Sequence, residues 1–204
     1  MAIIEPDNYR DKYLKSGRVG ALLVDHFFAS LHELVHLVRP RPNSVLEVGA
    51  GDGYSTQRIV RMLSGAASLE ASELRAEGVL ATRQLNPDVP VQQESVYQLN
   101  RGDKSFDLVV CLEVFEHLDD PGRALCEIAR VARHAAVISV PREPLWRALN
   151  VSRGKYLADL GNTPGHVQHW SAASFGKFVS SSFNVLAVRK PIPWTMMLLE
   201  PHTR

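Results

Sequence analysis

This sequence of 204 residues lacks the features that are typical of membrane proteins, of secreted proteins and of proteins stabilised by disulfides or structural zinc. No apolar run approaches the roughly 20 residues that a membrane-spanning helix requires. The N-terminus lacks the basic-then-apolar order of a signal peptide. The two cysteines, Cys111 and Cys126, show no CxxC spacing, so we expect small buried thiols in a reducing compartment rather than a disulfide or a zinc pair. These absences predict a cytoplasmic protein without a membrane span.

The chain also lacks a surplus of charge of either sign. It has 23 Lys and Arg against 22 Asp and Glu, which gives a formal net charge of +1. Such a balance provides no electrostatic reason for tight binding to long nucleic acid. It leaves room for a local basic patch.

What the sequence does contain is an alternation of strand-like and helix-like apolar patterns. We expect strands at 44–48, 66–72, 89–95, 106–114 and 135–140 and helices at 17–39, 55–63, 73–85 and after Asp119-Asp120-Pro121. Alternating strands and helices favour a parallel sheet with right-handed crossovers. Two further strands, separated by Pro191-Ile192-Pro193, predict an antiparallel hairpin at the C-terminal end. The expected fold is therefore an α/β, Rossmann-like, mostly parallel sheet with helices on both faces.

One domain, 1–204, accommodates all of these elements. Within it we expect four parts, namely an N-terminal lid and helix at 1–40, a cofactor-binding half at 41–140, a substrate-side insertion at 141–172, and a C-terminal helix with the hairpin at 173–204.

The stretch SVLEVGAGDGYS at 44–55 has three glycines between a strand and a helix, where backbone can approach a ligand closely. A P-loop would place Lys and Ser or Thr after Gly53, and a dinucleotide fingerprint starting at Gly49 would place a glycine at 54, but Tyr54 stands there. Glu47 would repel a pyrophosphate and attract an ammonium group. Glu73, after the second strand, can accept hydrogen bonds from ribose hydroxyls. Together these residues favour an adenosine ligand that carries a cation and no phosphate.

Three segments then resemble a known family. They are E-V-G-A-G-D-G, the later acid Glu73, and FDLVVCLEVFEHLDDPGRAL, and they resemble the class I S-adenosylmethionine-dependent methyltransferases, over roughly residues 40 to 140. The branch that contains the ubiquinone-biosynthesis O-methyltransferases is the most similar. The resemblance implies a seven-stranded sheet with an antiparallel last strand, and an enzyme that uses S-adenosyl-L-methionine and releases S-adenosyl-L-homocysteine.

The resemblance also implies roles for individual residues along the cofactor. Glu47 and the glycine loop would lie along the methionyl part, Glu73 would hold the ribose with Leu74 beside the adenine, and a stretch after the third strand would contact the adenine as well. The expected cofactor-binding residues are Glu47, Gly49, Ala50, Gly51, Gly53, Glu73, Leu74, Glu94, Ser95, Val96, Cys111 and Leu112. The alternative is structural: the glycines form only a tight turn, and Glu73 is a solvated charge at the end of a strand.

Glu113, Glu116 and His117 stand at i, i+3 and i+4, so they would share one face if the chain turns helical after the fourth strand. Two carboxylates and an imidazole can bind a divalent cation such as Mg²⁺. Some ubiquinone-type O-methyltransferases and the small-RNA 3′-terminal 2′-O-methyltransferases are similar here, and the RNA group adds a histidine four residues before a tryptophan. His166 precedes Trp170 by four residues, so it is the candidate fourth ligand, with His169 as the alternative.

Two further interpretations of this cluster remain open. Without a metal, His117 can act as the general base, because the ordinary pKa of histidine lies near neutrality. A structural role, in which the Glu-His pair only bonds neighbouring loops, is the other.

Three functions remain open as well. The first is methyl transfer to a small-molecule acceptor, at a hydroxyl oxygen. The second is metal-dependent 2′-O-methylation of an RNA terminus, and the third is a partner subunit that binds cofactor without catalysis. Segments 1–30 and 141–172 should carry substrate specificity, with Tyr9 and Tyr13 in a lid-like region, and a homodimer is a further hypothesis.

Overall fold

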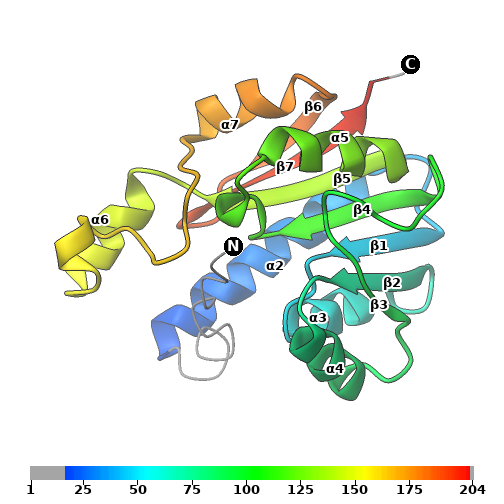
Figure 1. Cartoon of the computed structure of the whole chain (residues 1–204), viewed down its shortest axis with the longest axis horizontal. Coiled ribbons are helices and arrows are strands. Elements are labelled where there is room, and N and C mark those ends of the chain that lie inside the picture. Colours follow the sequence, from blue (N-terminus) through cyan, green and yellow to red (C-terminus); the bar gives the residue numbers. More distant parts are fainter. Residues whose placement is uncertain (1–16, 203–204) are drawn as a thin grey trace.

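A seven-stranded sheet with the strand order β3-β2-β1-β4-β5-β7-β6 runs through the middle of the structure, a computed structural model that describes residues 17–202 (Figure 1). The strands are β1 (Ser44–Val48), β2 (Ser68–Glu73), β3 (Val91–Gln93), β4 (Phe106–Leu112), β5 (Ala132–Pro141), β6 (Phe183–Arg189) and β7 (Trp194–Pro201). The first five strands pair in parallel, and β7 is antiparallel to both β5 and β6. The predicted sheet and its C-terminal hairpin are confirmed.

Helices cover both faces of this sheet. They are α2 (Arg18–Leu37), α3 (Tyr54–Leu63), α4 (Ala76–Leu85), α5 (Pro121–Val131), α6 (Leu145–Ser152) and α7 (Ala172–Val179), with two short 3₁₀ turns, η1 (Phe115–His117) and η2 (Leu157–Asp159). One buried apolar cluster lies between the sheet and α2, α3 and α4, and a second lies between the sheet and α5 and α7. In Figure 1, α6 extends away from the sheet at the end where β5 finishes.

Burial and capping explain why these elements form where they do. Every residue of β4 is buried, as expected for a central strand of a sheet that is covered on both faces. At the start of α5, Asp120 is the N-cap and its carboxylate accepts a hydrogen bond from the Arg123 amide, while Pro121 occupies the first turn. The strand at β4 and the helix after Asp119-Asp120-Pro121 are therefore confirmed.

The strand order defines where a ligand can bind. β1 lies between β2 and β4, so the chain leaves β1 toward one side of the sheet and β4 toward the other. In open α/β sheets such a switch point creates a crevice beyond the carboxyl ends of the strands. The glycine loop follows β1 and residues 113–117 follow β4, so both candidate sites lie at this edge.

Two local expectations are wrong. Cys126 is exposed on α5 rather than buried, although Cys111 is fully buried. The second helix begins at Ala76 instead of 73, because β2 continues through Glu73.

No helix in the part of the chain that the structure describes is long and apolar enough to cross a membrane. The lid-like region with Tyr9 and Tyr13 lies outside the described residues.

Candidate functional site

The loop between β1 and α3 depends on its glycines for its conformation. Gly49, Gly51 and Gly53 all have positive φ angles, of 80°, 59° and 87°, a region that other residues adopt at a cost. A Cβ atom at Gly53 would lie 2.8 Å from the Thr82 Cα, so Gly53 also permits close packing of α4 against the loop. A Cβ atom at Gly51 would meet no atom within 4 Å. The side of Gly51 that faces open space is where a ligand can approach the backbone.

Glu73 closes this loop from the end of the neighbouring strand β2. Its Oε2 accepts a hydrogen bond from the Gly51 amide at 2.9 Å, and its Oε1 accepts one from the Arg75 amide at 3.0 Å. The Arg75 Nε atom lies 3.3 Å from the same Oε1. Each carboxylate oxygen has two lone pairs, so Oε2 can accept a further hydrogen bond from a ligand. That Glu73 holds the ribose stays a prediction, and in the structure its carboxylate also positions the loop.

Helix α4 holds the loop through residues that the sequence analysis missed. The Thr82 hydroxyl donates to the Gly51 carbonyl at 3.0 Å, and the Asn86 side-chain amide donates to the Gly53 carbonyl at 2.9 Å. A Cβ atom on Gly78 would lie 2.8 Å from both the Gly51 carbonyl oxygen and the Glu73 Cγ atom. A glycine inside a predicted helix signals such a close approach. Thr82 and Asn86 carry no comparable signal in the sequence.

Glu47 is a buried carboxylate at the carboxyl end of β1. Its Oε2 accepts a hydrogen bond from the Thr56 hydroxyl at 2.6 Å, and its Oε1 has no hydrogen-bond partner among residues 17–202. Burial raises the pKa of Glu47 to about 7, against the opposing effect of the Ser55 and Thr56 hydroxyls. The negative charge of Glu73 raises this pKa further. A cationic group placed beside Glu47 would stabilise its ionised form.

The residues expected beside the adenine differ in their exposure and in whether their polar groups already bond within the protein. Leu74 is 62% exposed at the end of β2, so its side chain is available to an apolar ring. The Glu94 carboxylate accepts a hydrogen bond from the Asn100 amide and lies 3.3 Å from the Arg101 Nε atom, so it fixes the following loop. Ser95 likewise bonds within this segment, where its hydroxyl accepts from the Tyr97 amide. Val96 packs against the core at the edge of the second cluster.

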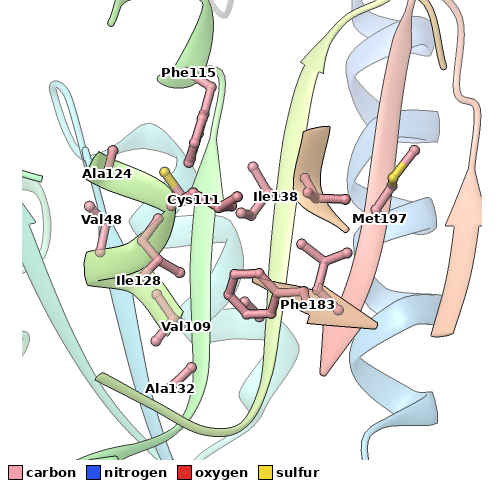
Figure 2. Packing of buried hydrophobic residues seen from close by; sticks show 14 of the residues in the cluster. Val48, Val109, Cys111, Phe115, Ala124, Ile128, Ala132, Ile138, Phe183 and Met197 are labelled. Atoms are coloured by element: carbon pink, nitrogen blue, oxygen red, sulfur yellow. The ribbon is translucent and has the colours of Figure 1, made fainter. Parts of the chain in front are cut away.

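Cys111 and Leu112 end β4, next to β1. Figure 2 shows the Cys111 sulfur inside the buried cluster with Phe115 and Ile138 around it. Burial raises the pKa of the Cys111 thiol, and the neighbouring carboxylates raise it further. Cys111 is therefore a neutral core residue, and only its backbone is left to contact a ligand. Leu112 is buried as well, in the cluster on the opposite face of the sheet.

A second set of polar side chains follows β4. Glu116, His117 and His166 each offer one ligand atom, and these atoms lie within 4.8 Å of one another. The His117 Nδ1 atom is 3.0 Å from the Gly165 carbonyl oxygen. Because a carbonyl only accepts, Nδ1 carries the proton, and the His117 Nε2 atom is directed toward Glu116 Oε1 at 4.0 Å. This donor set fits a borderline or hard divalent cation.

The loop that carries His166 is held in place by α6. The Trp146 ring stacks on the His166 ring with centroids 5.7 Å apart, and its Nε1 donates to the Thr163 hydroxyl at 2.9 Å. The Asn150 amide donates to the Gly161 carbonyl and to Thr163. The insertion between β5 and α7 thereby brings His166, 49 positions along the chain, next to His117.

The prediction that Glu113 shares a helical face with Glu116 and His117 is wrong. Glu113 has a φ of 57°, and only one 3₁₀ turn follows it, so the i, i+3, i+4 relationship of a helix does not arise. The Ser139 hydroxyl donates to Glu113 Oε1 at 2.8 Å, and Glu113 lies outside the cluster of ligand atoms. His169, the alternative ligand, lies near Arg147 and Asn162 instead. Burial and the Arg147 charge lower the pKa of His169.

A cavity of about 550 Å³ lies away from both groups, along the outer side of α5. Tyr97, Arg123, Cys126, Arg130 and His202 are among the residues that line it. None of the predicted site residues contributes to it.

The glycine loop, closed by an acid from β2, lies at the switch point of a Rossmann-like sheet, which is where such folds bind their ligands. Residues 46–140 match the family described as a methyltransferase domain. Over this segment the chain is similar to S-adenosylmethionine-dependent methyltransferases.

Curated relatives are similar over the same part of the chain, and solved structures share its fold. The chain is 31% identical over 120 residues, 57% of its length and 43% of the relative's, to a Mycobacterium tuberculosis protein named as a probable S-adenosylmethionine-dependent methyltransferase. It is 26% identical over 121 residues, 57% of its length and 49% of the relative's, to the ubiquinone biosynthesis O-methyltransferase of Alkalilimnicola ehrlichii. The chain thus spans less than half the length of either relative.

Among solved structures, magnesium protoporphyrin IX methyltransferase from Synechocystis PCC 6803, determined with bound S-adenosylhomocysteine, superposes with a TM-score of 0.71. The alignment covers 95% of this chain and 93% of that one at 15% identity. A likeness at this level of identity establishes the fold.

Proposed function

We propose that this chain transfers the methyl group of S-adenosyl-L-methionine to a hydroxyl oxygen of a small-molecule acceptor. One observation carries the proposal: the carboxylate–histidine cluster follows β4, and the glycine loop follows the adjacent strand β1. A proton-accepting group therefore stands at the same edge of the sheet as the candidate cofactor site. The name of the Alkalilimnicola relative, an O-methyltransferase, supports oxygen as the methylated atom.

In this proposal the chain binds the cofactor through groups already held in position. Glu47 attracts the ammonium of the methionyl part, the open side of Gly51 accommodates the chain of that part, Glu73 accepts hydrogen bonds from the ribose, and Leu74 lies against the adenine. The sulfonium is an activated leaving group, so the protein contributes mainly by orienting the acceptor oxygen toward the methyl carbon.

His117 is the proposed general base when no metal is bound. Its Nδ1 atom donates to the Gly165 carbonyl, which fixes the ring and gives Nε2 the lone pair. Glu116, 1% exposed, stands beside it and would stabilise a protonated imidazole.

As the alternative to the base role of His117, we propose that Glu116, His117 and His166 hold a divalent cation such as Mg²⁺. Their donor set fits one, since a carboxylate and two imidazoles converge within 4.8 Å. When bound, such an ion lowers the pKa of a hydroxyl that coordinates it. The sequence also suggests Glu113 as a ligand, and its position outside the cluster makes it the weakest member of that set.

The same cluster also supports a second candidate function, metal-dependent 2′-O-methylation of an RNA terminus. The observation in its favour is His166, four residues before Trp170 and next to His117. The balanced net charge of +1 favours the small-molecule acceptor. We place the protein in the cytoplasm on the strength of its two free cysteines.

The test measures release of S-adenosylhomocysteine from S-adenosylmethionine with catechols, monophenols, primary amines and a short RNA with a 3′-terminal 2′-hydroxyl, each with and without Mg²⁺. We expect turnover of the phenolic or catecholic acceptors that is lost in His117→Ala. Turnover of amines alone would contradict oxygen as the acceptor atom. Salt-sensitive turnover of the RNA alone would support the second function, and cofactor binding without turnover of any acceptor would indicate a non-catalytic subunit.

A further inference from the structure

Helix α2 carries a motif that the methyltransferase function does not use. Residues 32–36 read His-Glu-Leu-Val-His, with two histidines four positions apart and a glutamate after the first. In zinc hydrolases this H-E-x-x-H pattern on a helix supplies two metal ligands and a general base. Here it lies on the outer face of α2, where His32, Glu33 and His36 are all exposed.

The geometry of the two imidazoles suits chelation. Residues one helical turn apart lie on the same face, and the two ring centroids are 4.0 Å apart with the ring planes at 43° to each other. The His36 Nδ1 atom lies 3.0 Å from the His32 carbonyl oxygen. A carbonyl can only accept, so Nδ1 carries the proton and the Nε2 lone pair remains for a ligand. Metal-binding histidines are usually oriented in this way, by donating their other N–H to a backbone carbonyl.

The hydrolytic half of the motif is absent. The Glu33 Oε2 atom lies 2.7 Å from the Arg189 Nε atom on β6, so this carboxylate is engaged in an ion pair rather than held beside the histidines. Among residues 17–202, the single group of three or more potential ligands is the one at Glu116, so no third side chain completes a site at His32 and His36. Water would occupy the remaining positions.

We propose that His32 and His36 form a binding site for a borderline divalent transition-metal ion, of which Zn²⁺, Ni²⁺ and Cu²⁺ are the examples. His36 lies in the last turn of α2, where the exposed carbonyl ends of the helix favour a cation. The opposing charge is that of Arg39, whose Nη1 donates to the His36 carbonyl at 2.7 Å, while Arg189 is neutralised by Glu33. The bound ion bridges one turn of α2 and stabilises the folded chain. The site is independent of the cofactor site and of any methyl transfer.

The test is calorimetric titration with ZnCl₂ in the His166→Ala background, which removes a ligand from the cluster at Glu116. We expect one zinc ion per chain, with affinity lowered roughly tenfold or more by His32→Ala and by His36→Ala. His26→Ala is the matched control, because His26 is exposed on the same helix but six positions from His32. MgCl₂ should give no binding at this site, because Mg²⁺ prefers oxygen ligands.

A second measurement uses the wild-type chain. Zinc should protect His32 and His36, but not His26, from modification by diethylpyrocarbonate, as read by peptide mass spectrometry. Equal zinc affinity in His32→Ala, His36→Ala and His26→Ala, or equal modification of all three histidines with zinc present, would overturn the proposal.

Discussion

The Glu73 carboxylate at the end of β2 accepts a hydrogen bond from the Gly51 amide in the loop after β1, at 2.9 Å. Glu73 is the last residue of β2, and Gly51 lies in the loop that follows the adjacent parallel strand β1. This bond joins the residue proposed to hold the ribose to the loop proposed to hold the methionyl part. The conformation of the loop and the position of the Glu73 carboxylate therefore depend on each other. Substitutions around this bond should separate effects on folding stability from effects on cofactor binding.

Gly51→Ala and Gly53→Ala should affect different properties, the first mainly ligand binding and the second mainly folding stability. Both residues have positive φ, so each alanine costs about 1 kcal/mol or more of folding free energy. Only at Gly53 would the new Cβ atom meet backbone, the Thr82 Cα at 2.8 Å. We expect Gly53→Ala to lower the denaturation midpoint much more, and Gly51→Ala to weaken S-adenosylhomocysteine binding while the protein stays folded. Equal loss of stability in the two variants would contradict this account of the loop.

Thr82→Val tests whether α4 acts through the loop. The substitution removes the hydroxyl that donates to the Gly51 carbonyl and leaves the volume of the side chain nearly unchanged. We expect a loss of about 1 kcal/mol in the free energy of unfolding, with a several-fold loss of cofactor affinity although Thr82 touches no cofactor in our proposal. Thr82→Ser, which keeps the hydroxyl, is the control and should restore affinity.

Glu47→Gln should stabilise the ligand-free protein at alkaline pH. The folded-state pKa of Glu47 is raised from 4.5 to about 7. The native state therefore binds more protons than the unfolded state between these values, and wild-type stability falls as the pH rises through this window. Glutamine removes the cost of the buried charge, up to about 3 kcal/mol. In denaturant unfolding, the variant should have a higher free energy of unfolding than the wild type at pH 8, and the difference between the two should shrink toward pH 5. A difference that is constant with pH would argue against titration of Glu47.

The same substitution should weaken cofactor binding. If the ammonium of S-adenosylhomocysteine lies beside Glu47, the ligand binds the ionised carboxylate, so wild-type affinity should fall as the pH drops from 8 to 6. Glu47→Gln should bind more weakly and show a flatter pH profile. Calorimetry at several pH values measures the affinity of each protein and its dependence on pH. If the affinities of the two proteins change with pH in parallel, Glu47 does not bind the ammonium group.

Glu116→Gln and Glu113→Gln form a matched pair for the metal proposal. Glu116 belongs to the cluster with His117 and His166, whereas the Glu113 carboxylate accepts a hydrogen bond from Ser139. We expect Mn²⁺ binding, followed by the paramagnetic broadening of histidine resonances, to be lost in Glu116→Gln and retained in Glu113→Gln. The reverse result would restore Glu113 as the principal ligand.

The sequence carries much of this fold because its signals are local. The apolar run of β4, the proline after Asp120, and the proline-separated strands at the C-terminal end each specify an element by themselves. The glycine loop and Glu73 were recognisable because their spacing follows the order of β1 and β2.

The remaining features depend on contacts between distant segments. Thr82 and Asn86 reach the loop only because α4 packs against it, and His166 reaches His117 only because α6 fixes the insertion. The left-handed conformation of Glu113 interrupts the helical spacing that the sequence suggests, so Glu113 is directed to Ser139 instead. Cys126 illustrates the same limit, since its exposure depends on how α5 is rotated on the sheet.

The most direct test of the central claim is calorimetric titration of S-adenosylhomocysteine into the wild-type chain, Glu73→Gln and Glu77→Gln. Glu77 is exposed on α4 and serves as the control, and a thermal unfolding curve confirms that each variant is folded. We predict saturable binding to the wild type and to Glu77→Gln, and affinity lower by tenfold or more, about 1.4 kcal/mol, in folded Glu73→Gln. Absence of binding to the folded wild type, or equal binding by Glu73→Gln, would contradict the account of this site.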